Sequence, residues 1–138
     1  MNVILDTNIW VSFLFGKQLQ SVRSLFTDKD VHVYVSYDLI KELLDVTSRP
    51  KIKQHISQDA VVAMWDLMKE KCYVVDNYPT ISAPVRDPKD VYLLAMADAI
   101  PADVIITGDK DLLALTTFKE TEIITFAEFQ LLLSAKKE

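Results

Sequence analysis

The sequence predicts a doubly wound α/β domain, a three-layer α/β/α arrangement with a central, mostly parallel sheet of four to five strands. Two observations support this prediction. Short β-branched and apolar segments alternate with amphipathic helical segments along the 138 residues, as strands and crossover helices do in parallel sheets. No internal repeat and no linker rich in Gly or Ser interrupts this alternation, so residues 1–138 are expected to form a single domain.

The expected strands are short segments rich in β-branched and apolar residues, bounded by polar positions. They are residues 3–5, 31–36, 72–75, 104–107 and 122–125. Residues 104–107 read Val-Ile-Ile-Thr, which is the composition of a strand buried on both faces of a sheet.

The expected helices have apolar residues at helical spacing and capping residues at their starts. They are residues 7–15, 18–26, the segment after Ser36, and residues 57–71, 87–100, 112–115 and 126–134. Asp87-Pro88-Lys89-Asp90 is the clearest start, because a capping Asp precedes Pro at the first helical position and an acid follows in the first turn. Arg49-Pro50 and Pro101 each predict the end of a helix.

Composition excludes several classes of protein. The chain has 15 Lys and Arg against 20 Asp and Glu, a net charge of −5, so it lacks the overall basic character of a generic nucleic-acid binder. Its one cysteine, Cys72, excludes an internal disulfide and a Cys-based zinc site. No apolar run reaches the roughly 18 residues that span a bilayer. The first residues also lack the pattern of a secretory signal, so we expect a cytoplasmic protein with no membrane partner.

Four acidic residues are placed where a doubly wound sheet would bring them together. Asp6 ends the first expected strand, Asp109 follows the fourth, Asp90 opens a helix, and Glu42 lies about one turn into another. Ligands of such sheets bind beyond the carboxyl ends of the strands. Clustered carboxylates must either take up protons or hold a cation. With no His or Cys beside them, Mg²⁺ or Mn²⁺ fits better than zinc, and such ions suit phosphodiester chemistry.

Taken in order, these segments resemble the PIN-domain family, and more narrowly the VapC-like toxins of toxin–antitoxin pairs. The resemblance rests on Asp6-Thr7-Asn8 after an apolar strand, Glu42 in a Leu-rich helix, residues 87–90 opening an Ala-rich helix, and Thr107-Gly108-Asp109-Lys110-Asp111. It implies a Mg²⁺- or Mn²⁺-dependent endoribonuclease whose RNA products carry a 5′-phosphate and a 3′-hydroxyl. It also implies a cognate antitoxin protein as partner, and we expect a homodimer.

The resemblance implies a role for each matching residue. Asp6, Glu42, Asp90 and Asp109 would form the catalytic and metal-binding quartet. The auxiliary residues would be Thr7 and Asn8, which orient the site, Thr107, which supports Asp109, and the further acids Asp111 and Asp87. Asp87 suits a helix cap equally well, because Asp at that position accepts hydrogen bonds from the first backbone N–H groups of a helix.

One local concentration of positive charge has two interpretations. Arg49, Lys51 and Lys53, followed by His55, form either a solvated loop or a patch that steers RNA phosphates toward an acidic domain. Three further cations would contribute if they lie on the same side: Lys17, Arg23 and Arg86.

Two other functions compete with the nuclease. The first is a non-catalytic protein- or nucleic-acid-interaction module of the same fold, in which the apolar segment 10–15 would serve homodimerisation. The second is a phosphatase acting on small phosphomonoesters through an aspartyl nucleophile. Such a nucleophile needs a second Asp two residues after the first, and that position holds Asn8.

Overall fold

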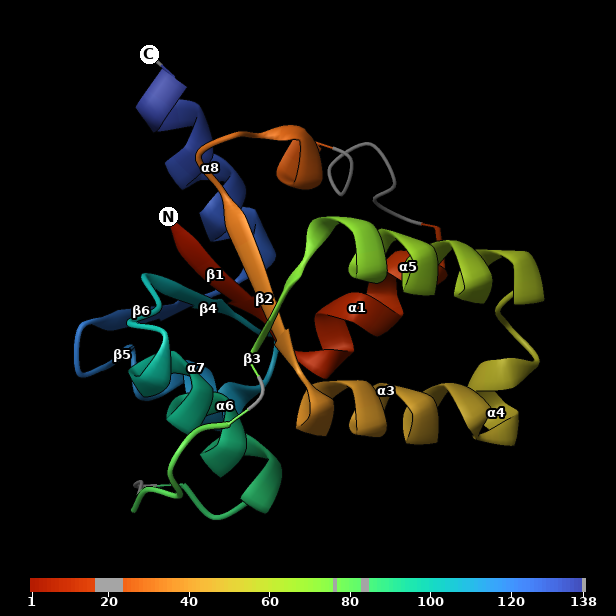
Figure 1. The fold of residues 1–138 in the computed structure, drawn as a ribbon, viewed down its shortest axis with the longest axis horizontal. Helices are drawn as coiled ribbons and strands as arrows, with labels where there is room; N and C mark the ends of the chain where they lie inside the picture. Colours follow the sequence, from red (N-terminus) through yellow and green to blue (C-terminus); the bar gives the residue numbers. More distant parts are fainter. Residues whose placement is uncertain (17–23, 76, 83–84, 138) are drawn as a thin grey trace.

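The sheet has the predicted doubly wound, mostly parallel topology (Figure 1). The computed structural model describes residues 1–16, 24–75, 77–82 and 85–137. The strands are β1 (Asn2–Leu5), β2 (His32–Ser36), β3 (Tyr73–Val75), β4 (Val104–Ile106), β5 (Thr117–Phe118) and β6 (Thr121–Ile124). They form one six-stranded sheet in the order β3-β2-β1-β4-β6-β5, in which only β5 and β6 pair antiparallel.

The sheet has one strand more than the sequence predicts, because β5 carries no sequence signal. It is two residues long and pairs Thr117 with Glu122 and Phe118 with Thr121. Two residues are too few for an apolar–polar alternation to be recognised. The turn passes through Lys119 at φ 53°, a left-handed conformation for which Asn or Gly would have been the usual signal.

Helices cover both faces of the sheet, which gives the three predicted layers. They are α1 (Thr7–Leu14), α3 (Tyr37–Ser48), α4 (Pro50–Lys53), α5 (Gln58–Lys71), α6 (Pro88–Ala99), α7 (Lys110–Leu113) and α8 (Phe126–Lys137). Of the helix expected over residues 18–26, residues 24–27 are described as helical, and residues 18–23 lie outside the described residues. No helix in the described part of the chain is both long enough and apolar enough to cross a membrane.

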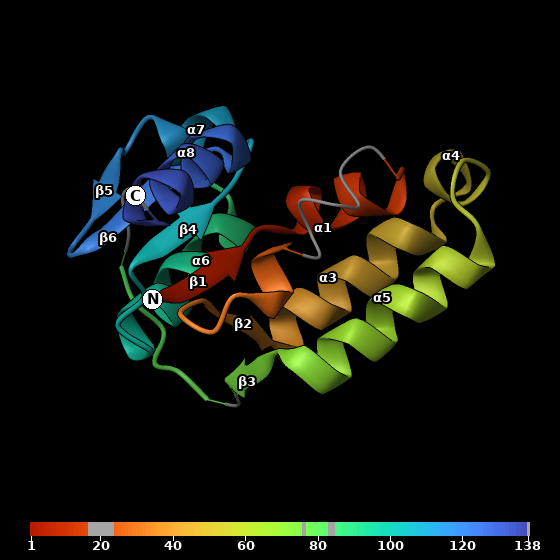
Figure 2. The ribbon, with the colours of Figure 1, turned by 90° about the horizontal axis from the view of Figure 1, so that it is seen from above.

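The two faces of β1 show how the core is divided. Val3 and Leu5 pack in one apolar cluster with residues of α1, α3, α5 and α8, while Ile4 packs in another with residues of α6 and α7, as the two-residue period of a strand requires. Figure 2 shows α1, α3 and α5 gathered on one side of β1. Trp10 is fully buried and Phe13 is 7% exposed in the first of these layers. The apolar segment expected to serve a homodimer is therefore mostly core, and Phe15 is its exposed aromatic ring.

Caps begin the helices where the sequence predicts them. The hydroxyl of Ser36 accepts from the Leu39 backbone N–H at 3.2 Å, and Ser57 accepts from Ala60 at 3.0 Å. Pro50 ends α3 but also opens the one-turn helix α4, with Pro at its first position. The basic run from Arg49 to Lys53 is therefore mostly helical, so the prediction of a loop conformation was wrong, while its three cations are exposed, as both interpretations require.

Candidate active site

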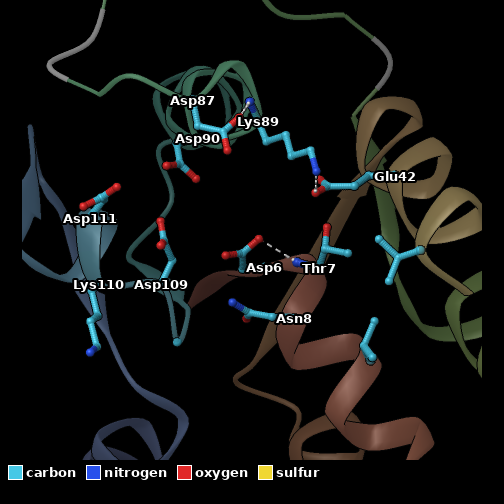
Figure 3. Close-up of a pocket in the computed structure, with 13 residues that line it drawn as sticks. Asp6, Thr7, Asn8, Glu42, Asp87, Lys89, Asp90, Asp109, Lys110 and Asp111 are labelled. Carbon is cyan, nitrogen blue, oxygen red and sulfur yellow. Dashed lines mark hydrogen bonds and ion pairs between the residues drawn. The ribbon is translucent and has the colours of Figure 1, made fainter. Parts of the chain in front are cut away.

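A pocket of about 660 Å³ lies at the carboxyl ends of β1 and β4. All four acids of the predicted quartet line it, and they come from four separate parts of the chain (Figure 3). The lining residues are Asp6, Thr7, Asn8, Val11, Glu42, Val46, Asp87, Lys89, Asp90, Gly108, Asp109, Lys110 and Asp111.

Asp6 is held in place by hydrogen bonds to the start of α1 and to the end of β4 and the residue after it. Its backbone N–H donates to the Ile106 carbonyl at 2.9 Å, which extends the pairing of β1 with β4. One carboxylate oxygen accepts from the Thr7 N–H and the other from the Thr107 hydroxyl, each at 2.7 Å. The side chain is only 8% exposed. Burial raises the pKa of Asp6, the two hydrogen bonds lower it, and the charges of Glu42 and Asp109 raise it further.

Asp90 lies in the first turn of α6 and is 7% exposed. The pKa of Asp90 is raised to about 7, first by burial and then by the charges of Asp109, Asp6 and Asp87 and a hydrogen bond to Asp109. The dipole of α6 favours an acid at this position by about 2 kcal/mol at most. Burial among like charges therefore outweighs the favourable helix position.

Asp109 occupies the N-cap position of α7, yet its side chain makes no capping hydrogen bond. Its backbone N–H donates to the Thr107 hydroxyl at 3.0 Å, and that hydroxyl donates to Asp6. The buried Thr107 thus fixes two acids relative to each other. Figure 3 shows the carboxyl groups of Asp6, Asp90 and Asp109 turned toward one shared space.

Glu42 stands apart from these three acids and is held by two residues of α6. One oxygen accepts from the Tyr92 hydroxyl at 2.6 Å, and the other lies 3.6 Å from the Lys89 ammonium. Burial and the neighbouring Glu42 raise the pKa of Tyr92, so the phenol stays protonated and donates. Lys89 and Tyr92 were not predicted as site residues, because no local pattern in the sequence marks a residue whose partner is about 50 positions away.

The auxiliary residues are placed unequally. Asp87 is exposed and caps α6, accepting from the Lys89 backbone N–H at 3.0 Å. Asp111 is exposed in the first turn of α7, and Asn8 is exposed beside Gly108. Thr7 is buried and lines the pocket.

The cations proposed to steer RNA do not line the pocket. Arg49, Lys51 and Lys53 lie at the far end of α3 and in α4 (Figure 1). Arg86 is exposed and is also absent from the lining, while Lys17 and Arg23 lie outside the described residues. The lysines that the structure does bring to the pocket are Lys89 and Lys110.

The acids of this pocket fit a hard cation that keeps part of its water shell better than one surrounded entirely by protein ligands. Within the described residues, no three Asp, Glu, His or Cys side chains are arranged to hold a metal ion as they stand. Mg²⁺ usually keeps several waters and needs only one or two carboxylates from the protein. Asp6, Asp90 and Asp109 could supply oxygen ligands in a pocket of about 660 Å³, which would leave room for that water shell.

Comparison with known proteins identifies a domain family and a solved structure of similar fold. A family model described as "PIN domain" matches residues 2–111, a range that includes every acid lining the pocket. One solved structure that matches is that of VapBC2 from Rickettsia felis bound to a DNA fragment from their promoter. It is 15% identical, with a TM-score of 0.56 over 89% of this chain and 97% of that chain, so the likeness concerns the fold. No curated protein sequence matches this chain.

Proposed function

Because the chain belongs to the PIN-domain family, we propose that it is a metal-dependent endoribonuclease that hydrolyses RNA phosphodiester bonds. The observation that supports this most is the burial of Asp6 and Asp90 in one open pocket with Asp109. Burying carboxylates beside one another is unfavourable, because each loses hydration and is repelled by its neighbours. A bound divalent cation would offset this repulsion.

Asp6, Asp90 and Asp109 would hold Mg²⁺ or Mn²⁺, with Glu42 contributing directly or through water. When bound, the cation would stabilise the negative charge that develops on phosphate oxygens and would make a nearby water more acidic. The protein's own contribution is positioning. Thr107 and the Thr7 N–H hold Asp6 in one orientation, and Tyr92 and Lys89 do the same for Glu42.

The biological setting that fits best is the toxin of a toxin–antitoxin pair, acting in the cytoplasm as a homodimer. The solved structure of similar fold is described as VapBC2 bound to a DNA fragment from their promoter. That shared fold, together with family membership, supports a cognate antitoxin protein as the partner of this chain.

The test is cleavage of a mixed RNA pool with Mg²⁺, Mn²⁺ or EDTA, comparing the wild type with Asp6→Asn. We expect cleavage with either cation, products bearing a 5′-phosphate, and loss of activity both in EDTA and in the variant. Glu122→Gln is a matched control, because this exposed acid lies outside the pocket and its change removes the same charge. Cleavage that survives both EDTA and Asp6→Asn would refute the mechanism.

The competing functions give different results in the same experiment. An interaction module would bind RNA or a partner protein after Asp6, Glu42, Asp90 and Asp109 are neutralised, and its wild type would not cleave RNA. A phosphatase would hydrolyse a chromogenic phosphomonoester in preference to RNA. Asn8 disfavours this activity because a phosphatase would need a second acid at that position.

A further inference from the structure

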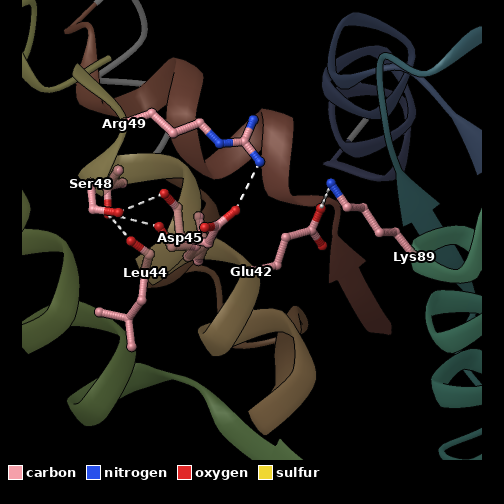
Figure 4. A network of polar contacts seen from close by, with 8 residues as sticks. Glu42, Leu44, Asp45, Ser48, Arg49 and Lys89 are labelled. Carbon is pink, nitrogen blue, oxygen red and sulfur yellow. Dashed lines mark hydrogen bonds and ion pairs between the residues drawn. The ribbon is translucent and has the colours of Figure 1, made fainter. Parts of the chain in front are cut away.

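We propose that Lys89 is a substrate-binding residue whose ammonium group leaves Glu42 to contact a phosphate oxygen of bound RNA. The inference rests on the proposed ribonuclease function and adds a residue to it outside the acidic quartet. Lys89 extends from the first turn of α6 across the pocket toward α3 (Figure 3, Figure 4).

The main chain of Lys89 is fixed while its side chain is available. Its N–H donates to the capping Asp87 at 3.0 Å, and Pro88 restricts the backbone just before it. The Lys89 side chain is 51% exposed, and its ammonium lies 3.6 Å from Glu42, too far for a hydrogen bond. Since the pair is an ion pair alone, the three ammonium donors remain available to another acceptor.

Glu42 does not need Lys89 to keep its position. Its second oxygen accepts a 2.6 Å hydrogen bond from Tyr92, and its side chain is only 14% exposed. In this pair the carboxylate is therefore anchored and the lysine is the member that can move. A long, exposed lysine stem with its ammonium held loosely matches that role.

The neighbouring ion pair on α3 is a useful contrast. Asp45 lies in the last turn of α3 and Arg49 caps the end of that helix; their charged groups are 2.8 Å apart, and the side chains of Arg49 and Asp45 are 52% and 67% exposed (Figure 4). That pair joins nothing across the fold and does not line the pocket. The Lys89–Glu42 pair instead connects α6 with α3 across the pocket.

The charges of the pocket explain why RNA, a polyanion, would bind more tightly with the positive charge of Lys89 present. Among the described residues, six acids line the pocket: Asp6, Glu42, Asp87, Asp90, Asp109 and Asp111. Two lysines line it as well, and Figure 3 shows Lys110 pointing away from Asp6, Asp90 and Asp109 while Lys89 points across the pocket. One divalent cation would not offset six acids, so a phosphate entering near Glu42 would gain from the Lys89 charge.

The test is binding of a short, fluorescently labelled, mixed-sequence single-stranded RNA in Ca²⁺, followed by anisotropy over a range of salt concentrations. Lys89→Gln should raise Kd about five- to tenfold, the size expected for one net hydrogen bond in a pocket open to water. It should also make the slope of log affinity against log salt shallower by about 0.7. Lys89→Arg keeps the charge and should retain that slope. Lys69→Gln, an exposed lysine of α5 outside the pocket, is the matched control and should change Kd less than about twofold.

A second background separates phosphate binding from a purely structural role. If Lys89 only held Glu42, then Lys89→Gln would have no further effect in a Glu42→Gln protein. We expect the full increase in Kd to persist there. Loss of the effect in that background, or identical binding by Lys89→Gln and Lys69→Gln, would overturn the inference.

Failure of the proposed function would look different. A wild type that binds RNA through Lys89 but never cleaves it would refute the nuclease and leave the lysine contact in place. A wild type that cleaves RNA, with a Lys89→Gln variant that binds it as Lys69→Gln does, would refute the contact alone. A wild type that binds no RNA would refute both.

Discussion

Each end of the sheet carries a pocket lined by acids, and the two ends accommodate those acids differently. The pocket at the amino ends of the strands measures about 470 Å³ and includes Asp103, Glu120 and Glu122. All three are exposed, and the Met1 residue and Lys136 line the same pocket. At the carboxyl ends, Asp6 and Asp90 are 8% and 7% exposed and face Asp109.

Burial and mutual approach, more than the number of acids, make the carboxyl end a candidate site. An exposed carboxylate such as Asp103 can accept a backbone N–H, here that of Asn2 at 2.7 Å, and stay solvated. A buried carboxylate next to another loses hydration and gains repulsion, so its pKa rises. Matched substitutions at the two ends of the sheet should therefore have different effects.

The largest difference is expected in catalysis. Asp90→Asn should lower the initial rate of RNA cleavage by about two to three orders of magnitude, since a bound cation contributes several kcal/mol to the transition state. Glu122→Gln at the other end should leave the rate within about twofold. Initial rates on one RNA in Mg²⁺ measure both. Equal losses in the two variants would mean that activity depends on the overall negative charge of the protein and not on this pocket.

The next difference concerns stability against pH in EDTA. The pKa of Asp90 is raised to about 7 in the folded protein, against about 4 when unfolded. The folded state therefore binds this proton more tightly. Stability from this group is fully present below pH 4 and is lost as the pH rises to about 7.

Asp90→Asn should therefore be more stable than the wild type at pH 8, by roughly 1–3 kcal/mol, with the gain fading toward pH 4. Urea unfolding in EDTA at several pH values measures this difference. Glu122→Gln should follow the wild-type curve. An Asp90→Asn protein that is less stable at pH 8 would contradict the burial of a repelled carboxylate.

Two buried threonines allow a smaller and sharper comparison. Thr107 donates to Asp6 at the carboxyl end, and Thr121 donates to the Ala102 carbonyl at the amino end, each at 2.7 Å. Replacing either by Val should cost about 1–2 kcal/mol of stability. Only Thr107→Val should also lower cleavage, by about tenfold, because it removes one of the two hydrogen bonds that hold Asp6 and so raises the pKa of Asp6 further. Thermal unfolding and initial rates of the two variants check this, and similar rates for both would contradict it.

The smallest effect is expected outside both pockets. Arg49→Gln removes an exposed pair with Asp45 and should change stability by less than about 0.5 kcal/mol. Its RNA affinity should change less than about twofold, because Arg49 is already paired and does not line the pocket. An affinity loss as large as that of Lys89→Gln would indicate instead that the basic run of Arg49, Lys51 and Lys53 steers RNA.

The sequence predicts the features that depend on local pattern. Apolar runs and caps such as Ser36, Ser57 and Asp87 mark the parallel strands and main helices, and the acids at strand ends mark the pocket. Two-residue β5 and one-turn α4 are too short to have a period. The contacts of Glu42 with Tyr92 and Lys89 join distant segments, so they follow only from the fold.

The hydroxyl of Thr107 joins Asp6 to the main chain of Asp109, residues that lie more than a hundred positions apart. β1, which carries Asp6, sits between β2 and β4, so its carboxyl end is completed only when β4 pairs with it. During translation, Asp6, Glu42 and Asp90 leave the ribosome before the strand that closes the pocket around them. A prematurely terminated copy ending before residue 104 would therefore contain most of the acids and no assembled centre.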